Sequence, residues 1–532
     1  MHDVGAAGRP GGNTDAWMNG QHSSDGLFRR GHVPSDTRPK AQSLDVAAAA
    51  RLDVLRNSAL AMIAFSSMRA DHAQILDGHK ETPAAIPADP GLSCKSHLER
   101  DVSRSMSDKP TDAAAPRDRW YVLAVLTIVY ALNIADRFSV STLIEPIRKE
   151  MHLSDSGIAF LTGVALALFY VTAGIPIAAF ADRASRQKIV TIALGIWSGM
   201  TAVCGLAQNY WQLLLARFAV GIGEAGGTPP STSILADKFP PALRPMALTI
   251  FALGASLGAW LGSSVAGEVA ERGGWRAAFI VLGVPGLVVA MIVWLTVREP
   301  RRGQLDSTAR DLKPSTLLTT LRFITTQRSA IHLLLGASVA TFWSWGLMWW
   351  TPTFLQRSHH LTVGQAGHLL GTMHLVAGTA GTLLAGWLMG RPAATDPRYI
   401  ARLLACVTAL ATVPSMILYW VLSERAATVL LWIFVPSVYF YIGPILGLLQ
   451  NVMPANMRAT ACGVLLFIAN VANLVLAPQI IGWLSDWFSV SFGAGQESLR
   501  WALLLLAPTG FWAAWHLWTS GATIREDEAR VT

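Results

Sequence analysis

Residues 120–519 form a succession of apolar blocks, each about 20 residues long, which is the length that a helix needs to cross the hydrocarbon core of a membrane. Two examples are TIALGIWSGMTAVCGLA at residues 191–207 and LLACVTALATVPSMILYWVL at residues 403–422. Only 14% of the residues are charged, compared with about a quarter in a typical soluble domain. We therefore predict an all-α membrane protein with about twelve transmembrane helices, because no soluble fold of this length buries so much apolar sequence.

The basic residues outside these blocks lie in short loops on alternate sides of the predicted helices. Residues 182–188 (DRASRQK) and 298–313 (REPRRGQLDSTARDLK) are basic, whereas the opposite loop at 358–365 (SHHLTVGQ) contains no lysine or arginine. Loops rich in these residues stay in the cytoplasm. This rule predicts cytoplasmic termini for a multi-pass protein of the plasma (inner) membrane. A basic excess confined to such loops does not indicate nucleic-acid binding.

The four cysteines, Cys94, Cys204, Cys406 and Cys462, are scattered along the chain, and three of them lie within apolar blocks. Their spacing matches neither a disulfide framework nor a metal site. We interpret them as small apolar packing residues, and we expect no metal ion and no cofactor.

Residues 1–115 contain no apolar run that could span a membrane. The best run, SALAMIAF at residues 58–65, is too short and lies too far from the start for a signal peptide. We expect a polar and disordered N-terminal extension. Two explanations for it remain open: a regulatory tail, or a true translation start near Met106.

A short motif recurs in the same orientation in the two halves of the apolar region, FPPALRPMALTIF in the first and MPANMRATACGVLLF in the second. Three residues match at a constant offset of 214: Pro240 with Pro454, Arg244 with Arg458 and Ala247 with Ala461. Parallel repeats of six helices build one large class of transporters. We therefore predict the following organisation: extension 1–115, six-helix bundle 116–298, cytoplasmic linker loop 299–328, six-helix bundle 329–520 and short cytoplasmic tail 521–532.

Four charged residues lie inside predicted membrane helices of the first bundle. On the first helix, Asp136 and Arg137 share an arc of roughly 120° with two polar neighbours, Tyr130 and Asn133. On the fourth helix, Arg217 and Glu224 are seven residues apart on one face. Because a charge at the centre of a membrane helix costs about 2.5–3.5 kcal/mol or more, we expect the two acids and two bases to pair across the helices.

Two interpretations of this cluster remain open. In the first, it is a structural ion-pair network that holds the bundle together. In the second, Asp136 and Glu224 bind protons, as buried carboxylates do in many transporters. Arg137 and Arg217 are then the counter-ions, and together with Asn133 and Tyr130 they are candidates for contacting the substrate.

The second bundle has no acid at the centre of a predicted helix. Its candidate cavity residues are aromatic or uncharged polar side chains: Trp345, His374, Tyr441, Asn470 and Asn473. The contrast between a charged half and an aromatic half suits an amphipathic substrate. For His374, polar packing remains an alternative to a position in the cavity.

At the level of the family, residues 118–520 resemble the major facilitator superfamily. AAFADRASRQK at residues 178–188 resembles the cytoplasmic gate motif of that family, with Asp182, Arg183 and Arg186 at the matching positions. The match departs from the usual pattern at Ala178 and Ser185, where glycines are common. RFAVGIGEA on the fourth helix resembles the motif in which the family links an arginine to proton transfer.

Within the superfamily, NIADR at residues 133–137 and the long segment at 223–262 are most similar to the Spinster-like subgroup. This resemblance implies proton-linked transport of lysolipids or sphingolipid-like molecules, with functional roles for Asp136, Arg137, Arg217 and Glu224. Organic-anion:proton symporters of the superfamily share parts of both motifs and remain an alternative.

Other classes of protein fit the sequence less well. No metalloprotease or nucleophile motif lies in the predicted cavity helices, so we do not expect an enzyme. An uncoupled facilitator or a lipid scramblase remains open. The glycines at 254, 258 and 262 predict close helix packing rather than an antiporter signature. We expect a monomer whose partners are a small-molecule or lipid substrate, protons and membrane lipids.

Overall fold

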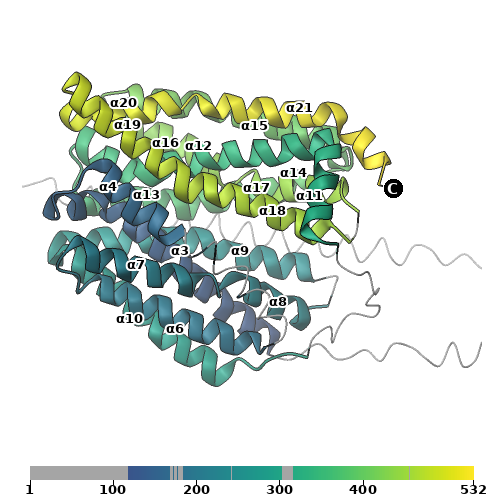
Figure 1. The fold of residues 1–532 in the computed structure, drawn as a ribbon, viewed down its shortest axis with the longest axis horizontal. Helices are drawn as coiled ribbons and strands as arrows, with labels where there is room; N and C mark the ends of the chain where they lie inside the picture. The colour runs from purple at the N-terminus through teal and green to yellow at the C-terminus, as the bar shows by residue number, and fades with distance from the viewer. Residues whose placement is uncertain are drawn as a thin grey trace, which may run out of the picture. The chain divides into compact units, whose positions relative to one another are not determined.

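The structure is a computed structural model, and all its described residues belong to one compact unit, Arg104–Thr532 (Figure 1). The described residues are 118–167, 170, 172, 177, 184–240, 243–301, 315–454 and 456–531. The predicted N-terminal extension lies outside them, as do Asp182 and Arg183 of the predicted gate motif. We call 118–301 the N-terminal half and 315–531 the C-terminal half.

The described part of the N-terminal half consists of helices, two of which contain a π-helical turn. In chain order they are α3 (Arg119–Glu150), α4 (Asp155–Ala159), the π-helix η1 (Phe160–Val164), α6 (Arg186–Cys204), α7 (Tyr210–Glu224), α8 (Thr228–Lys238), α9 (Arg244–Trp260), the π-helix η2 (Leu261–Val265) and α10 (Ala266–Thr296). Pro229 and Pro230 lie in the first turn of α8, where proline is tolerated because the first amides of a helix have no partner within it. The all-helical prediction is confirmed for this half.

The C-terminal half is also helical in its described part. Its elements are α11 (Leu317–Thr326), α12 (Arg328–Ser358), α13 (Val363–Met373), the π-helix η3 (His374–Gly378), α14 (Thr379–Met389), the 3₁₀ turn η4 (Pro392–Thr395), α15 (Pro397–Trp420), α16 (Glu424–Val438), α17 (Ile442–Asn451), α18 (Arg458–Asn470), the π-helix η5 (Val471–Leu476), α19 (Ala477–Phe492), the 3₁₀ turn η6 (Gly495–Glu497), α20 (Ser498–Leu506) and α21 (Thr509–Ala529). Helix α11 lies within the segment predicted as a linker loop.

Helix α21 continues to Ala529, through the first nine residues of the segment predicted as a short cytoplasmic tail, 521–532. Asp527 is buried there and holds the start of α12. Its Oδ2 accepts hydrogen bonds from the backbone amide of Ser329 (2.8 Å) and from the Ser329 hydroxyl (2.7 Å). A carboxylate at this position satisfies free amides at a helix start, so the last turns of the chain belong to the fold.

Eight stretches of the described residues are long and apolar enough to cross a membrane. One of them, Met246–Thr296, contains two helices joined at a kink, because Gly274 has a φ of +78°. A shorter apolar helix runs from Asp155 to Ala167, where the described residues break off. The multi-helix membrane fold is therefore confirmed, and the number of twelve crossings stays a prediction.

The sequence repeat reappears as a repeat of local structure. Helices α9 and α18 begin at the matching arginines, Arg244 and Arg458. Each arginine donates from Nε to the carbonyl of the residue five positions earlier, Phe239 in one half and Met453 in the other, both at 3.1 Å. The π-helical turns η1 and η3 also begin 214 residues apart. The two halves thus share both a sequence motif and the position of a helix irregularity.

The predicted glycine stripe packs against helix α3. A Cβ atom added at Gly258 would meet the backbone carbonyl of Ala131, and the flanking glycines, Gly254 and Gly262, face the carbonyls one helical turn to either side, those of Thr127 and Ala135. Only a residue without a side chain allows two helix backbones to approach so closely. The prediction of close helix packing is confirmed.

The helices run between two ends of the molecule, and we name each end after an arginine that lies there. Arg186 is the first residue of α6, and Arg357 is near the end of α12. At the Arg186 end, α3 begins, and Asp118 forms an ion pair with Lys238 of α8 (2.5 Å). At the Arg357 end, α3 and α12 end. In Figure 1 the labels α4 and α19 mark the Arg357 end, and α8 and α11 mark the Arg186 end.

The two halves contact each other toward the Arg357 end. Ser141 in the second half of α3 donates to the carbonyl of Trp349 (2.6 Å), and α13 packs on η2. All the hydrogen bonds and ion pairs that join described residues of the two halves lie between this level and the Arg357 end. The described hydrogen bonds and ion pairs between the halves therefore lie toward one end of the molecule.

Candidate functional site: a central cavity beside a buried charge cluster

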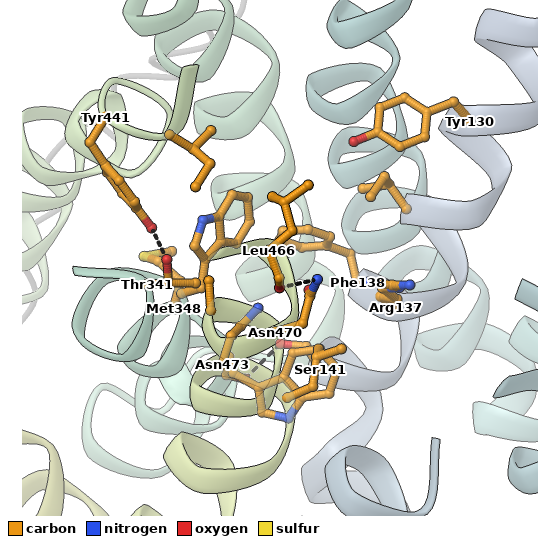
Figure 2. Close-up of a pocket in the computed structure, with 16 residues that line it drawn as sticks. Tyr130, Arg137, Phe138, Ser141, Thr341, Met348, Tyr441, Leu466, Asn470 and Asn473 are labelled. Carbon is orange, nitrogen blue, oxygen red and sulfur yellow. Dashed lines mark hydrogen bonds between the residues drawn. The ribbon is translucent and has the colours of Figure 1, made fainter. Parts of the chain in front are cut away.

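A cavity of about 240 Å³ lies between the two halves, beside the middle of α3 and α12 (Figure 2). Six of the residues predicted from the sequence line it: Tyr130, Arg137, Trp345, Tyr441, Asn470 and Asn473. The wall contributed by the C-terminal half contains aromatic, amide and apolar side chains, whereas Arg137 is the charged group on the wall among the described residues. This division between a cationic side and an aromatic side agrees with the expectation for an amphipathic ligand.

Asp136 points away from the cavity, although it is adjacent to Arg137. Its Oδ2 lies 2.8 Å from Nη1 of Arg217, and its Oδ1 accepts a hydrogen bond from the Thr201 hydroxyl at 2.5 Å. The side chain is 4% exposed, and that of Arg217 is fully buried. The predicted polar face of the first helix is therefore split, because Asp136 faces α6 and α7 while Arg137 faces the cavity.

Arg137 pairs with the second buried acid, Glu224. Its Nε and Nη2 lie 2.9 and 2.7 Å from Oε2 of Glu224. Its guanidinium also lies 4.8 Å from the ring centre of Tyr170, a distance at which a cation is attracted to an aromatic face. The predicted pairing of acids with bases across helices is confirmed, and Arg137 connects the pair to the cavity.

Glycines bring these charged groups together. Gly221 and Gly223 lie just before Glu224 on α7, and a Cβ at either would meet a neighbouring backbone, that of Leu166 or of Trp197. Helix α7 ends at Glu224 itself, and the chain turns before α8 begins. A side chain at either glycine would push α7 away from these neighbours and would therefore displace Glu224.

Several buried polar atoms of this cluster have no hydrogen-bond partner among the described residues: Oε1 of Glu224, Nε and Nη2 of Arg217, and Nδ2 of Asn133. Most buried polar atoms in folded proteins are paired. These atoms give the cluster spare capacity to accept or donate a hydrogen bond, so it can change its pairing without first breaking every contact.

Three of the residues predicted to contact the substrate or to line the cavity do not lie on its wall: Arg217, Asn133 and His374. His374 is 1% exposed, and its Nδ1 lies 3.0 Å from the Tyr439 hydroxyl. Its ring packs edge-on against Phe138, 4.7 Å between centres, so Phe138 separates it from the cavity. Asn133 is buried in the same way. The sequence left polar packing open as the alternative for His374, and the position of this side chain agrees with polar packing.

The wall residues that were not predicted from the sequence include Phe138, Ser141 and Thr341. Ser141 lies one helical turn beyond Arg137 and therefore on the same face. Thr341 accepts a hydrogen bond from the Tyr441 hydroxyl at 3.0 Å. The helical spacing could have predicted Ser141, but the sequence contains no signal for the contact between Thr341 and Tyr441.

Arg186 of the predicted gate motif is 3% exposed and binds two acids at the Arg186 end. Its Nε lies 2.7 Å from Glu299 and its Nη1 2.5 Å from Asp237. Its Nη2 also donates to the carbonyl of Pro300 (3.1 Å). The described contacts of Arg186 thus join the start of α6 to the end of α8 and to the segment after α10, all within the N-terminal half.

Two helical halves with a shared repeat around a central cavity define a membrane transporter. Residues 126–477 match the Major Facilitator Superfamily, and the chain belongs to this family. It is a transporter of the superfamily, and it is similar to Spinster-like members of the superfamily and to an efflux pump, as the following relatives show.

The chain is 31% identical to an MFS-type efflux pump of Mycolicibacterium smegmatis over 420 residues, which is 78% of this chain and 96% of the relative. It is 25% identical to the sphingosine-1-phosphate transporter SPNS2 of Danio rerio over 430 residues, 76% of this chain and 85% of the relative. A crystal structure of a bacterial homologue of the human lysosomal transporter Spinster, inward-facing and unoccupied, has 29% sequence identity and a TM-score of 0.68. That likeness covers 77% of this chain and 98% of the other.

Proposed function

We propose that the protein is a proton-coupled secondary transporter that moves an amphipathic (lysolipid- or sphingolipid-like) or organic-anion substrate by alternating access. The observation that carries this proposal is the ion pair between Arg137 and Glu224. Glu224 is fully buried, whereas the Arg137 side chain is 14% exposed and lines the cavity. One partner can therefore exchange a proton while the other meets the substrate.

The charge balance of the cluster explains how the two events are coupled. Asp136, Glu224, Arg137 and Arg217 are cross-paired, and their formal charges cancel. Protonation of Glu224 would leave a net positive charge in a buried site, which is costly in a membrane interior. An anionic group of the substrate at Arg137 would restore the balance. Proton binding therefore increases the affinity of the cavity for an anion, and anion binding favours the protonated acid.

The volume and the lining of the cavity limit the size and the chemical class of the substrate. Its volume of about 240 Å³ is below the roughly 300–1,000 Å³ of a typical site for a drug-sized ligand. It can hold an anionic head group beside Arg137 with the aromatic wall of Trp345 opposite, and a lipid tail would need further space between the halves. Similarity to SPNS2 supports the lipid, and the small volume supports a compact organic anion.

The setting of the transporter belongs to the same proposal. We place it in the plasma (inner) membrane as a monomer with twelve crossings. Both termini lie in the cytoplasm, because the basic loops follow the rule that such loops stay on that side. The Arg186 end is then cytoplasmic and the Arg357 end external. In this orientation, the described conformation is closed to the outside, because the hydrogen bonds and ion pairs between the described residues of the two halves lie toward the Arg357 end.

The proposal can be tested in liposomes that contain the purified protein and a pH-sensitive dye. Lysophospholipids and a panel of small organic acids are added under an imposed pH gradient. We expect one substrate class to move protons with the wild-type protein. Glu224→Gln should abolish this movement, because the amide keeps the shape of the side chain but cannot exchange a proton.

Glu150→Gln is the matched control. Glu150 also pairs with an arginine of its own half, Arg276 (2.5 Å), but it is half exposed and lies outside the cavity. The control should transport protons as the wild type does. Substrate movement that is equal in wild type and Glu224→Gln, without proton flux, would contradict proton coupling and identify an uncoupled facilitator or scramblase.

A further inference from the structure

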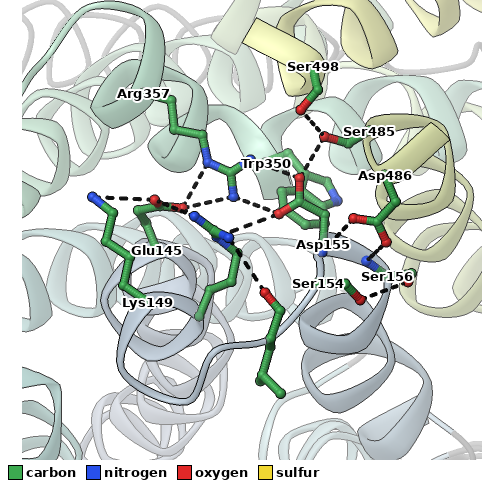
Figure 3. Close-up of polar contacts among 12 residues, drawn as sticks. Glu145, Lys149, Ser154, Asp155, Ser156, Trp350, Arg357, Ser485, Asp486 and Ser498 are labelled. Carbon is green, nitrogen blue, oxygen red and sulfur yellow. Dashed lines mark hydrogen bonds and ion pairs between the residues drawn. The ribbon is translucent and has the colours of Figure 1, made fainter. Parts of the chain in front are cut away.

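A second buried ionic cluster lies at the Arg357 end, away from the central cavity (Figure 3). Arg357, near the end of α12, binds two carboxylates of the N-terminal half at once. Its Nε lies 2.8 Å from Glu145 near the end of α3, and its Nη1 and Nη2 lie 2.8 and 2.6 Å from the two oxygens of Asp155. One guanidinium therefore joins two N-terminal helices to one C-terminal helix.

These three side chains are almost fully removed from solvent, with 4–6% of each side chain exposed. A two-pronged contact between arginine and carboxylate is among the strongest polar contacts in proteins. Removing one partner of a buried charge pair leaves the other unpaired at a large cost. The contacts of Arg357 therefore hold the halves together far more firmly than an exposed ion pair could.

A second contact between the halves acts on the same helix start. Asp486 of α19 accepts hydrogen bonds from the backbone amides of Asp155 and Ser156, both at 2.9 Å. The helix that starts there runs at least to Ala167, so its first amides carry the positive end of a helix dipole. A carboxylate from one half thus caps a helix of the other half.

The backbones at this seam touch directly. A Cβ at Gly482 of α19 would meet the carbonyl of Asp155, and a Cβ at Gly163 of η1 would meet the carbonyl of Leu474 in η5. No side chain lies between these segments to take up a movement. Separation of the halves at the Arg357 end must therefore break the contacts of Arg357 and of Asp486 together.

We propose that Arg357 and Asp486 form a two-part latch that keeps the Arg357 end of the transporter closed and must release for this end to open. This inference goes beyond proton coupling and the substrate, since it requires only that the protein alternates between two states. The latch adds to the stability of the described state. Weakening it shifts the population toward the state that is open at the Arg357 end.

Arg148 provides a matched control within the same cluster. Its Nη2 lies 3.0 Å from Glu145 and its Nε 3.6 Å from Asp155, so it neutralises the same two acids as Arg357. However, Arg148 belongs to the N-terminal half, as both acids do. Arg148→Gln removes the same charge as Arg357→Gln and leaves every bond of Arg357 across the seam in place.

The test measures distances between spin labels in the full-length protein, after replacement of its four native cysteines. One label pair, Gln208→Cys with Val490→Cys, reports on the Arg357 end, where both side chains are exposed. A second pair, Lys188→Cys with Ala393→Cys, reports on the opposite end and is also exposed. No substrate and no pH gradient are needed, so the result is independent of the proposed transport activity.

For Arg357→Gln we expect the population with a longer distance at the Arg357 end to rise roughly tenfold from a minor state, while the distance at the opposite end shortens. Asp486→Asn should shift both distances in the same direction by less. Arg148→Gln should resemble the wild type. Unchanged distances in Arg357→Gln, or an equal shift in Arg148→Gln, would overturn the latch.

Arg357→Gln leaves two buried acids with Arg148 as their remaining arginine partner, and it can fail to fold for that reason. Asp486→Asn then decides the question, because Asp486 is only partly buried. The side-chain oxygen of the asparagine can still accept one of the two hydrogen bonds. Its control is Asp396→Asn, which changes a carboxylate paired within the C-terminal half, with Arg525 at 2.6 Å. A shift in Asp486→Asn but not in Asp396→Asn supports the latch, and equal distances in the two variants refute it.

Discussion

Asp136 and Arg137 are neighbours in the sequence, yet their side chains point to different parts of the molecule. Asp136 is bound by Arg217 and Thr201 inside the N-terminal half, whereas Arg137 reaches the cavity with Glu224 behind it. The sequence predicted that these four charges would pair. It did not predict which of them would face the cavity, because adjacent residues on a helix differ by about 100° and only the packing of α6 and α7 decides.

Arg217 should contribute strongly to stability because it is fully buried and is the partner of Asp136. Replacing one member of a buried ion pair costs roughly 3–5 kcal/mol, since the other charge stays unpaired. We expect Arg217→Gln to lower the unfolding temperature in detergent strongly. Arg217→Gln combined with Asp136→Asn should recover most of the loss, because no buried charge then remains unpaired. A double variant as unstable as the single one would contradict this pairing.

At the scale of the helix, the structure contains features that the apolar pattern does not reveal. Four described helices carry π-helical turns, η1, η2, η3 and η5, and these turns lie where the halves meet, as in the contact of η1 with η5. π-helical turns are often found at functional sites. Hydropathy predicts where a helix crosses the membrane, but a π turn depends on one extra residue fitted against a neighbour. The pattern therefore predicted the helices and missed their irregularities.

The packing of α9 on α3 gives a prediction at this scale. Gly258→Val should destabilise the N-terminal half by about 1–3 kcal/mol, because its Cβ would meet the backbone of Ala131, which cannot move aside. Gly195→Ala on α6 is the control, since a Cβ there meets no atom within 4 Å. Unfolding in detergent should separate the two variants. Equal stability of both would show that the glycine stripe is not needed for packing.

At the scale of the whole molecule, the repeat was predictable from three matched residues, because the same turn before a helix needs the same side chains in both halves. The closed end was not predictable. Glu145, Asp155 and Arg357 lie near helix ends, where charged residues are common and usually solvated. Only the fold brings both acids within 3 Å of Arg357. The cavity and the closed end together describe one state of a transporter that alternates between two.

The central claim is that a proton and the substrate move together through the Glu224 cluster. The most direct test uses the substrate identified in liposomes and measures its accumulation against a concentration gradient as the pH difference across the membrane is varied. We predict that accumulation by the wild type rises with the pH difference. Glu224→Gln should still exchange substrate across the membrane but show no accumulation at any pH difference. Accumulation that follows the pH difference equally in both proteins would contradict the account.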